Sequence, residues 1–382
     1  MPTPLEAALA WLAGQRPAMK ALLARLVAQN SFTRNTAGVN AVADLVAAEL
    51  SRIGLSLERI PGVRFGDHLF FKSRAPGPPA FLVGHTDTVF APGTFEGWRE
   101  EGELGCGPGA FDMKGGLVVA LFALEALRRA GLLDRVPVRG LFVSDEEVGS
   151  PESQPLTRER AGGAACALGL ESGRPGDLVV TRRKGLAALE VAARGAAAHA
   201  GNEHEKGRNA IWAVARFVDR VQGLTDYARG VTVNVGRIEG GTTRNTVPAT
   251  ARCEVDLRFL TVKDGDRLQE GVARAATEAA VAGTRVDVAR VSFRPPLERT
   301  DASAALAAEV GACQAECGLG SGEAPLAGGG SDASTTGAAG VPSVDGLGPR
   351  GAGFHTPEEQ VDLGSLVPKA AALVRFLARR AG

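Results

Sequence analysis

Three short segments, almost wholly apolar and each running directly into histidine or acidic residues, constrain the fold of this chain most. They span residues 80–84, 138–143 and 165–170. Apolar runs of this length predict strands that are buried on both faces. Helical stripes lie around them, one over residues 39–53 that stops at Gly54 and one that follows Gly115 and Gly116. Such strands alternating with helices predict an α/β domain with a mixed, mostly parallel sheet flanked by helices.

The pattern changes near residue 184, where strict alternation of apolar and polar residues begins to dominate. It is clearest over residues 231–235 and 251–259. Alternation with period two predicts an antiparallel sheet with one solvated face. Helical stretches at about 207–222 and 264–281 are expected to cover its other face. Because 382 residues exceed one ordinary core, we predict a catalytic α/β domain of residues 1–183 and 293–382, interrupted by an inserted α+β domain of residues 184–292.

The net charge limits the kinds of partner that we expect, and the cysteine content indicates the cellular compartment. Lys+Arg and Asp+Glu both number 43, so the formal net charge is zero. A balanced chain is a poor binder of polyanions, so we expect neither nucleic acid nor membrane as a partner. The five cysteines form no CxxC pair, and the N-terminal segment has neither a basic start nor a long apolar run. These features predict reduced thiols and a cytoplasmic protein.

Histidine and carboxylate residues follow each of the three buried strands. His85 and Asp87 follow the first strand, and Glu146 and Glu147 follow the second. Glu171 follows the third. Ligands of open α/β sheets gather outside the carboxyl ends of the strands, so we expect these side chains to meet at one edge.

Two further candidates lie in glycine-rich loops that precede predicted helices. Asp112 lies within residues 105–116, and His355 lies within residues 351–356. A single strand-end histidine such as His85 is more often a core or surface group than a ligand. Two imidazoles that converge with several carboxylates instead suit Zn²⁺ with mixed nitrogen and oxygen ligands.

Two metal ions fit this set better than one. A mononuclear catalytic zinc takes three protein ligands, whereas a bridging carboxylate with one histidine and one further carboxylate on each ion uses five. The five are His85, Asp112, Glu147, Glu171 and His355. Neighbouring residues of an extended backbone point in opposite directions, so Glu146 is expected to face the reacting water as general base. Asp87 is expected to fix the tautomer of His85.

At these residues the chain resembles the co-catalytic zinc exopeptidases and amidohydrolases, which include glutamate carboxypeptidase, aminoacylase, acetylornithine deacetylase and succinyl-diaminopimelate desuccinylase. The matching segments are GHTDTV (84–89), GPGAFDMKGG (107–116), SDEEVGS (144–150), LES (170–172), AHAG around His199, GGGSD (328–332) and GFHT (353–356). They run through nearly the whole chain and are most similar to the glutamate carboxypeptidase branch.

The resemblance implies a role for each candidate in the catalytic domain. It implies that His85 and Glu171 hold one zinc and that Glu147 and His355 hold the other. Asp112 would bridge the two ions. Glu146 would be the base and Asp87 would orient His85, and the sequence departs from the family pattern at none of these seven positions.

The resemblance also gives the inserted domain the role of a lid and dimerisation domain. His199 would reach the active site of the partner subunit and stabilise the oxyanion, although by spacing alone it is an ordinary surface histidine. Asn245 and Arg258 match positions that hold the carbonyl oxygen and the carboxylate of the substrate. Gly330 begins a turn that could present backbone N–H groups to the same carboxylate. An Arg fork suits carboxylate recognition.

We therefore expect a zinc-dependent metallocarboxypeptidase or amidohydrolase, a homodimer with two Zn²⁺ per subunit that acts on a small peptide or N-acyl amino acid. The ligand set also accepts Co²⁺ or Mn²⁺. An N-acyl-amino-acid deacylase and a catalytically silent ligand-binding relative are the alternatives. The absence of GxSxG argues against a serine hydrolase. A dinucleotide fingerprint at residues 105–110 is rejected because a polar stretch rather than an apolar strand precedes it and because Pro108 removes an N–H.

Overall fold

A computed structural model describes residues 1–381 of the protein, which divide into two compact units. The first unit comprises Met1–Arg182, Glu298–Ala327 and the chain from Ser331 onward. The second comprises Arg183–Leu297 and the three residues Gly328–Gly330. The lid and dimerisation role expected for residues 184–292 stays a prediction.

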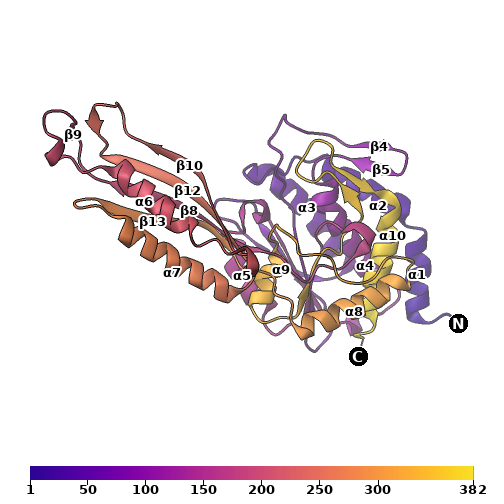
Figure 1. The fold of residues 1–382 in the computed structure, drawn as a ribbon. Helices are drawn as coiled ribbons and strands as arrows, with labels where there is room; N and C mark the ends of the chain where they lie inside the picture. Colours follow the sequence, from indigo (N-terminus) through magenta and orange to yellow (C-terminus); the bar gives the residue numbers. More distant parts are fainter. Residues whose placement is uncertain (382) are drawn as a thin grey trace. The chain divides into compact units, whose positions relative to one another are not determined.

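A six-stranded mixed sheet forms the centre of the first unit (Figure 1). Its order is β1-β2-β6-β3-β7-β14. Strands β6, β3, β7 and β14 pair in parallel, whereas β2 pairs antiparallel with both β1 and β6. The strands are β1 (Ser56–Ile60), β2 (His68–Lys72), β3 (Ala80–His85), β6 (Val138–Val143), β7 (Cys166–Gly169) and β14 (Ser343–Val344). The three strands predicted from apolar runs are thus β3, β6 and β7, and they are neighbours.

Helices cover both faces of this sheet. One face is packed by α1 (Pro4–Ala13), α2 (Arg16–Val27), α3 (Thr36–Ile53), α4 (Gly115–Arg129), α8 (Asp301–Ala315) and α10 (Leu366–Ala378), which share one core with it. The other face is packed by α5 (Ser153–Ala161) and α9 (Asp332–Ala338). Phe71 and Leu82 point to the first core, whereas Phe70 and Phe81 point to the second. The predicted α/β fold is confirmed. No helix within residues 1–381 has both the length and the apolar character needed to cross a membrane.

A small antiparallel sheet in the first unit joins segments that are far apart in the sequence. Its order is β15-β16-β5-β4. The strands are β4 (Arg99–Glu101), β5 (Leu104–Cys106), β15 (Gly351–Ala352) and β16 (Gln360–Asp362). Because β16 pairs with β5, the loop that carries His355 lies beside the segment that leads into Asp112.

The second unit is a four-stranded antiparallel sheet with two helices on one face (Figure 1). Its order is β10-β12-β8-β13, and a two-stranded ribbon pairs β11 with β9. The strands are β8 (Gly185–Arg194), β9 (Ala198–His199), β10 (Thr232–Gly240), β11 (Thr246–Val247), β12 (Thr250–Phe259) and β13 (Arg285–Arg294), and the helices are α6 (Ala210–Gln222) and α7 (Val262–Ala279). The apolar residues of the alternating strands face α6 and α7, as the sequence pattern predicts.

Candidate metal centre

Three adjacent strands deliver side chains to one edge of the large sheet. His85 is the last residue of β3. Glu147 lies in the turn that follows β6, and Glu171 lies two residues beyond the end of β7. Since β6, β3 and β7 are parallel neighbours, their carboxyl ends meet. The imidazole of His85 and the carboxylate of Glu171 are both buried.

Asp112 is brought to the same edge by the start of α4. It lies in an irregular helical turn, η1 (Ala110–Lys114), directly before that helix. Helix α4 begins against the end of β7, because a Cβ atom at Gly116 would lie 2.0 Å from the carbonyl oxygen of Leu170. Only glycine permits this close approach, and the approach sets Asp112 opposite His85 and Glu171.

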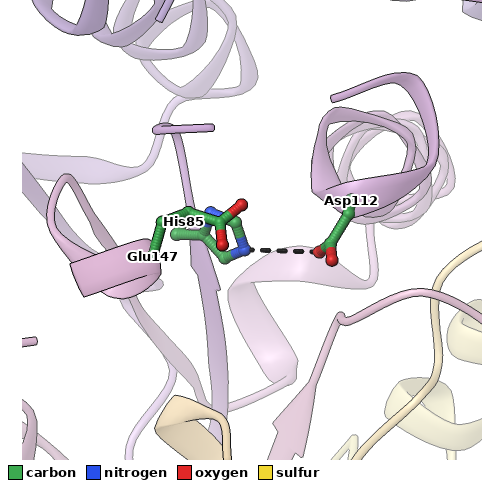
Figure 2. Close-up of side chains that lie close together, drawn as sticks. All are labelled: His85, Asp112 and Glu147. Carbon is green, nitrogen blue, oxygen red and sulfur yellow. Dashed lines mark ion pairs between the residues drawn. The ribbon is translucent and has the colours of Figure 1, made fainter. Parts of the chain in front are cut away.

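The carboxylate of Asp112 lies between two pairs of side chains. Its Oδ1 atom is 3.5 Å from Nε2 of His85, and that nitrogen is 3.7 Å from Oε1 of Glu171. Its Oδ2 atom is 3.5 Å from Nε2 of His355, which is 3.1 Å from Oε2 of Glu147. Figure 2 shows His85, Asp112 and Glu147 converging, with ligand atoms all within 4.8 Å of one another. The five predicted metal ligands thus lie in one cluster.

Asp87 holds the imidazole of His85 and the turn after β6 at the same time. Nδ1 of His85 lies 3.0 Å from the carbonyl oxygen and 3.3 Å from Oδ1 of Asp87. The backbone N–H groups of Glu146 and Glu147 each donate to the Asp87 carboxylate over 3.2 Å, and the hydroxyl of Thr33 donates over 2.7 Å. With Nδ1 engaged, Nε2 of His85 is left facing Asp112 and Glu171.

The local backbone at Glu146 differs from the extended conformation expected from the sequence. Glu146–Val148 form a 3₁₀ turn, so the alternation of an extended strand does not apply there. In a 3₁₀ turn, with three residues to a turn, successive side chains diverge by about 120°. Glu146 and Glu147 therefore still point in different directions, but for a reason other than the one expected.

The cluster has the nitrogen and oxygen ligand atoms of a cation site, and its carboxylates lack compensating positive charge. Oδ1 of Asp112 and Oε1 of Glu147 are buried without a hydrogen bond. Burial raises the pKa of Glu147 to about 8, and the Asp112 carboxylate adds to this effect. Burial and the same carboxylate raise the pKa of Glu171 to about 7. Three buried carboxylates stay ionised together only beside added positive charge, and a divalent cation bound by these nitrogen and oxygen ligands would supply it.

The two histidines respond to the same surplus of negative charge. Burial alone would lower the pKa of His85, but the carboxylates of Glu171 and Asp112 hold it well above its usual range. Hydrogen bonds to Asp112 and Glu147 raise the pKa of His355 to about 10. His355 is the exposed member of the cluster and has a left-handed backbone, with φ of 64°. Strained, non-glycine positions of this kind cluster at functional sites.

Glu359 is a buried neighbour of the cluster that the sequence analysis did not single out. Its carboxylate accepts the backbone N–H groups of Gly109, Phe111 and Asp112 over 3.0, 2.9 and 2.9 Å. Burial raises its pKa to about 7, although the three N–H donors favour the ionised form. In the sequence it is the second residue of an unremarkable Glu-Glu pair four positions after His355, a pattern typical of a solvated turn. Thr33 was missed for the same reason, since no motif surrounds it.

His199 and Asn245 lie together in the second unit. His199 pairs with Thr246 between β9 and β11, and the carbonyl oxygen of Asn245 accepts the N–H of Ala200 over 2.9 Å. Nδ1 of His199 lies 3.2 and 3.1 Å from the backbone N–H groups of Gly201 and Asn202, which donate to it. An Nδ1 atom that accepts leaves the proton of a neutral imidazole on Nε2.

Arg258 and the glycine segment 328–330 also lie together in the second unit. Arg258 donates from Nε and Nη2 to both carboxylate oxygens of Asp256, over 2.8 and 2.9 Å, and from Nη1 to the carbonyl oxygen of Gly328 over 3.4 Å. A Cβ atom at Gly330 would lie 2.3 Å from Cδ of Arg294. Arg258 is thus held by Asp256 on its own strand, next to the segment that contains Gly330.

Comparison with known proteins identifies relatives over most of the chain. Carboxypeptidase G2 of Pseudomonas sp. (strain RS-16) is 30% identical over 362 residues, which cover 93% of this chain and 87% of that protein. Acetylornithine deacetylase of Myxococcus xanthus is 30% identical over 279 residues, which cover 66% of this chain and 70% of that protein.

Solved structures share the fold. A tripeptidase from Staphylococcus aureus superposes with a TM-score of 0.79 at 20% identity, covering 96% of this chain and 98% of that structure. A dinuclear metal-binding peptidase from Bacillus subtilis superposes with a TM-score of 0.71 at 16% identity, covering 96% and 98%. The model of peptidase family M20/M25/M40 matches residues 81–379. The resemblance drawn from the motifs is therefore confirmed, and the chain belongs to peptidase family M20/M25/M40.

Proposed function

We propose that this hydrolase is a di-zinc carboxypeptidase that cleaves the amide bond next to a free carboxylate of a small peptide or acyl amino acid. The observation that carries the proposal is the carboxylate of Asp112, whose two oxygens face two separate histidine–carboxylate pairs. His85 and Glu171 would hold one ion, and Glu147 and His355 the other. When bound, the ions polarise a carbonyl group and make water a better nucleophile at neutral pH.

Two side chains at the edge of the sheet supply proton transfer and the orientation of the metal ligands. The Glu146 carboxylate takes a proton from the attacking water and passes it to the nitrogen of the leaving amine, which is general base and then general acid catalysis. Asp87 keeps the proton of His85 on Nδ1, so that Nε2 stays available to a metal. The same carboxylate, by accepting the N–H groups of Glu146 and Glu147, keeps the base and a metal ligand in a fixed relation.

Three residues of the second unit are proposed to bind the substrate. Arg258 would pair with the free carboxylate and Asn245 would hold the carbonyl oxygen, with N–H groups near Gly330 assisting. His199 would stabilise the oxyanion in the active site of the partner subunit. The two N–H groups that donate to Nδ1 of His199 support this role, because they leave Nε2–H as the outward donor.

The test of the reaction is a hydrolysis screen with zinc-loaded protein. Its substrates are folyl- and benzoyl-glutamate, N-acetyl amino acids and dipeptides. We expect hydrolysis of the acyl-glutamates, because the motifs are most similar to the glutamate carboxypeptidase branch and a carboxypeptidase is among the relatives. Preference for N-acetyl amino acids would favour the alternative of an N-acyl-amino-acid deacylase, which the similarity to acetylornithine deacetylase supports. No turnover of any substrate by protein holding two zinc ions would refute the proposed reaction.

Replacement of Glu146 separates an enzyme from a silent ligand-binding relative. Glu146→Gln removes the base but none of the five metal ligands. An enzyme should lose about 10²- to 10⁴-fold in kcat while retaining two zinc ions per chain, measured by elemental analysis. A binding protein would show no turnover in the wild type and unchanged ligand affinity in the variant.

We further propose that the protein is a homodimer formed through the second unit. On α6, Ile211 and Trp212 are 40% and 58% exposed, and on the edge strand β10 Ile238 is 55% exposed. Ile211 lies close to Gly240 of β10, so these apolar side chains belong to neighbouring elements. Exposed apolar residues that gather in this way are typical of interfaces between subunits.

The cytoplasm is the proposed compartment. All five cysteines are free thiols, and four of them are buried. Burial raises the pKa of Cys166, Cys253 and Cys313 to about 11, so these thiols are protonated and unreactive at neutral pH. Unpaired, inert thiols suit a reducing environment.

A further inference from the structure

Glu359 joins the two loops that carry Asp112 and His355. Its side chain accepts three backbone N–H groups of the loop before α4, from Gly109, Phe111 and Asp112. Its backbone carbonyl also accepts the N–H of Gly107 over 3.3 Å. On its other side, the N–H of Glu359 donates to Thr356, the residue after His355, over 3.1 Å. One residue thus contacts both the segment that carries Asp112 and the segment that carries His355.

The three N–H groups converge on one point, where the two oxygens of the Glu359 carboxylate can accept from all of them. Gly109 has a left-handed backbone, with φ of 74°, which turns its N–H toward the same point as those of Phe111 and Asp112. Oε1 accepts two of the bonds and Oε2 accepts the third. Glu359 is 1% exposed, so water cannot replace a lost acceptor, and a buried N–H without a partner costs about 1–3 kcal/mol.

We infer that Glu359 is a positioning residue that sets the orientation of the bridging carboxylate of Asp112. The N–H of Asp112 is one of its three donors, so the backbone from which that carboxylate extends is fixed by Glu359. This sets the place from which the Asp112 side chain reaches between His85 and His355. The inference rests on the proposed function only in taking Asp112 as a ligand shared by two metal ions.

If Glu359 only stabilised the fold, its replacement would have a different effect from the replacement of a positioning residue. A purely structural carboxylate affects the stability of the protein and leaves the affinity for metal unchanged. Glu125 offers a matched control in the same unit, because it is also 1% exposed. Its carboxylate accepts hydrogen bonds from Arg52, Arg128 and Arg129 on the far part of α3 and α4, and none of these residues belongs to the cluster.

The experiment compares zinc affinity in wild type, Glu359→Gln and Glu125→Gln. A glutamine carries one acceptor oxygen and one N–H₂ donor, so at least one of the three N–H groups faces a donor. We expect Glu359→Gln to bind zinc about 10- to 100-fold more weakly, as outer residues of metal sites do when replaced. Glu125→Gln should lower the thermal midpoint of the metal-free protein and leave zinc affinity unchanged. Zinc alone is titrated against a competing chelator, and the visible spectrum of the Co²⁺ form is recorded in parallel.

Unchanged zinc affinity and an unchanged Co²⁺ spectrum in folded Glu359→Gln would overturn the inference, as would equal weakening in Glu125→Gln. If Glu359→Gln does not fold, Glu359→Asp carries the test. It keeps the charge and both oxygens but draws them back by one methylene, and wild-type zinc affinity in that variant would also overturn the inference. Failure of the proposed function is seen separately, as wild-type protein that binds fewer than two zinc ions or hydrolyses no substrate.

Discussion

At the scale of single residues, the chemistry of the site depends on which atoms of a side chain are already engaged. Asp87 shows this most clearly, because its carboxylate meets two N–H groups, one hydroxyl and one imidazole nitrogen. Every one of these partners is a donor. The Asp87 carboxylate therefore serves as a hydrogen-bond acceptor toward all of these partners.

Asp87→Asn tests this arrangement. The amide places a donor where all four partners donate, so we expect His85 to lose its orientation and activity to fall about 10- to 100-fold. Steady-state kcat/KM on the best substrate of the screen measures the loss. Thr33→Val is the matched control because it removes one donor and leaves the carboxylate, and its loss should be smaller. Equal activities for wild type and Asp87→Asn would contradict the role given to Asp87.

The sequence was sufficient to name the residues of the cluster and insufficient to name those that support them. His85, Glu147 and Glu171 are recognisable because each lies at or just after the end of an apolar strand. The carboxyl ends of parallel strands meet at one edge of a sheet, so the sequence is enough to place these residues together. Glu359 acts through backbone N–H groups of a loop about 250 residues away. No pattern of residue types records such a contact, since backbone donors are the same at every position.

At the scale of elements, strands with clean periodicity were predictable and irregular or very short ones were not. β3 and β6 are almost wholly apolar, and β12 alternates strictly. In β13, by contrast, the register shifts between Arg290 and Ser292, and Val291 is 60% exposed, so the alternation is broken. The strands of the sheet β15-β16-β5-β4 have two or three residues each, which is too short for any period to show.

The close approach of α4 to β7 makes Gly116 the most sensitive glycine near the site. Gly116→Ala sets a methyl group 2.0 Å from the carbonyl oxygen of Leu170, so the helix must move away from the strand. We expect a loss of about 1–3 kcal/mol in unfolding free energy together with weaker zinc binding, measured by denaturant titration and chelator competition. Gly14→Ala is the control, since its nearest atom would be 3.9 Å away and neither property should change.

Glu125 gives α4 a stability that depends on pH. Burial raises its pKa, but Arg128, Arg129 and Arg52 outweigh burial and lower the pKa to about 2, from 4.5. A lowered pKa means that the stabilisation is complete above about pH 4.5 and is lost as the pH falls toward 2. The thermal midpoint of Glu125→Gln should therefore lie furthest below that of the wild type at neutral pH, and the gap should narrow below pH 4.5. A gap that stays constant down to pH 3 would contradict this assignment.

At the scale of the whole molecule, the balance of 43 basic and 43 acidic residues leaves apolar contact rather than net charge as the basis for self-association. The proposed dimer surface on α6 and β10 can be tested by Trp212→Glu. A buried charge without a partner is costly, so we expect the variant to sediment as a monomer where the wild type sediments as a dimer. Tyr227→Glu is the control, because Tyr227 is 84% exposed outside that surface. A dimeric Trp212→Glu protein would exclude this surface.

The carboxylate of Asp112 turns one oxygen toward each half of the cluster, and this has a consequence for how such a centre can diversify. Because the two histidine–carboxylate pairs share this one carboxylate, a change at Asp112 affects both pairs together. If each half binds an ion, as proposed, a substitution at position 112 would remove a ligand from both ions at once. A substitution at His85, Glu171, Glu147 or His355 would instead reach only one half of the cluster directly.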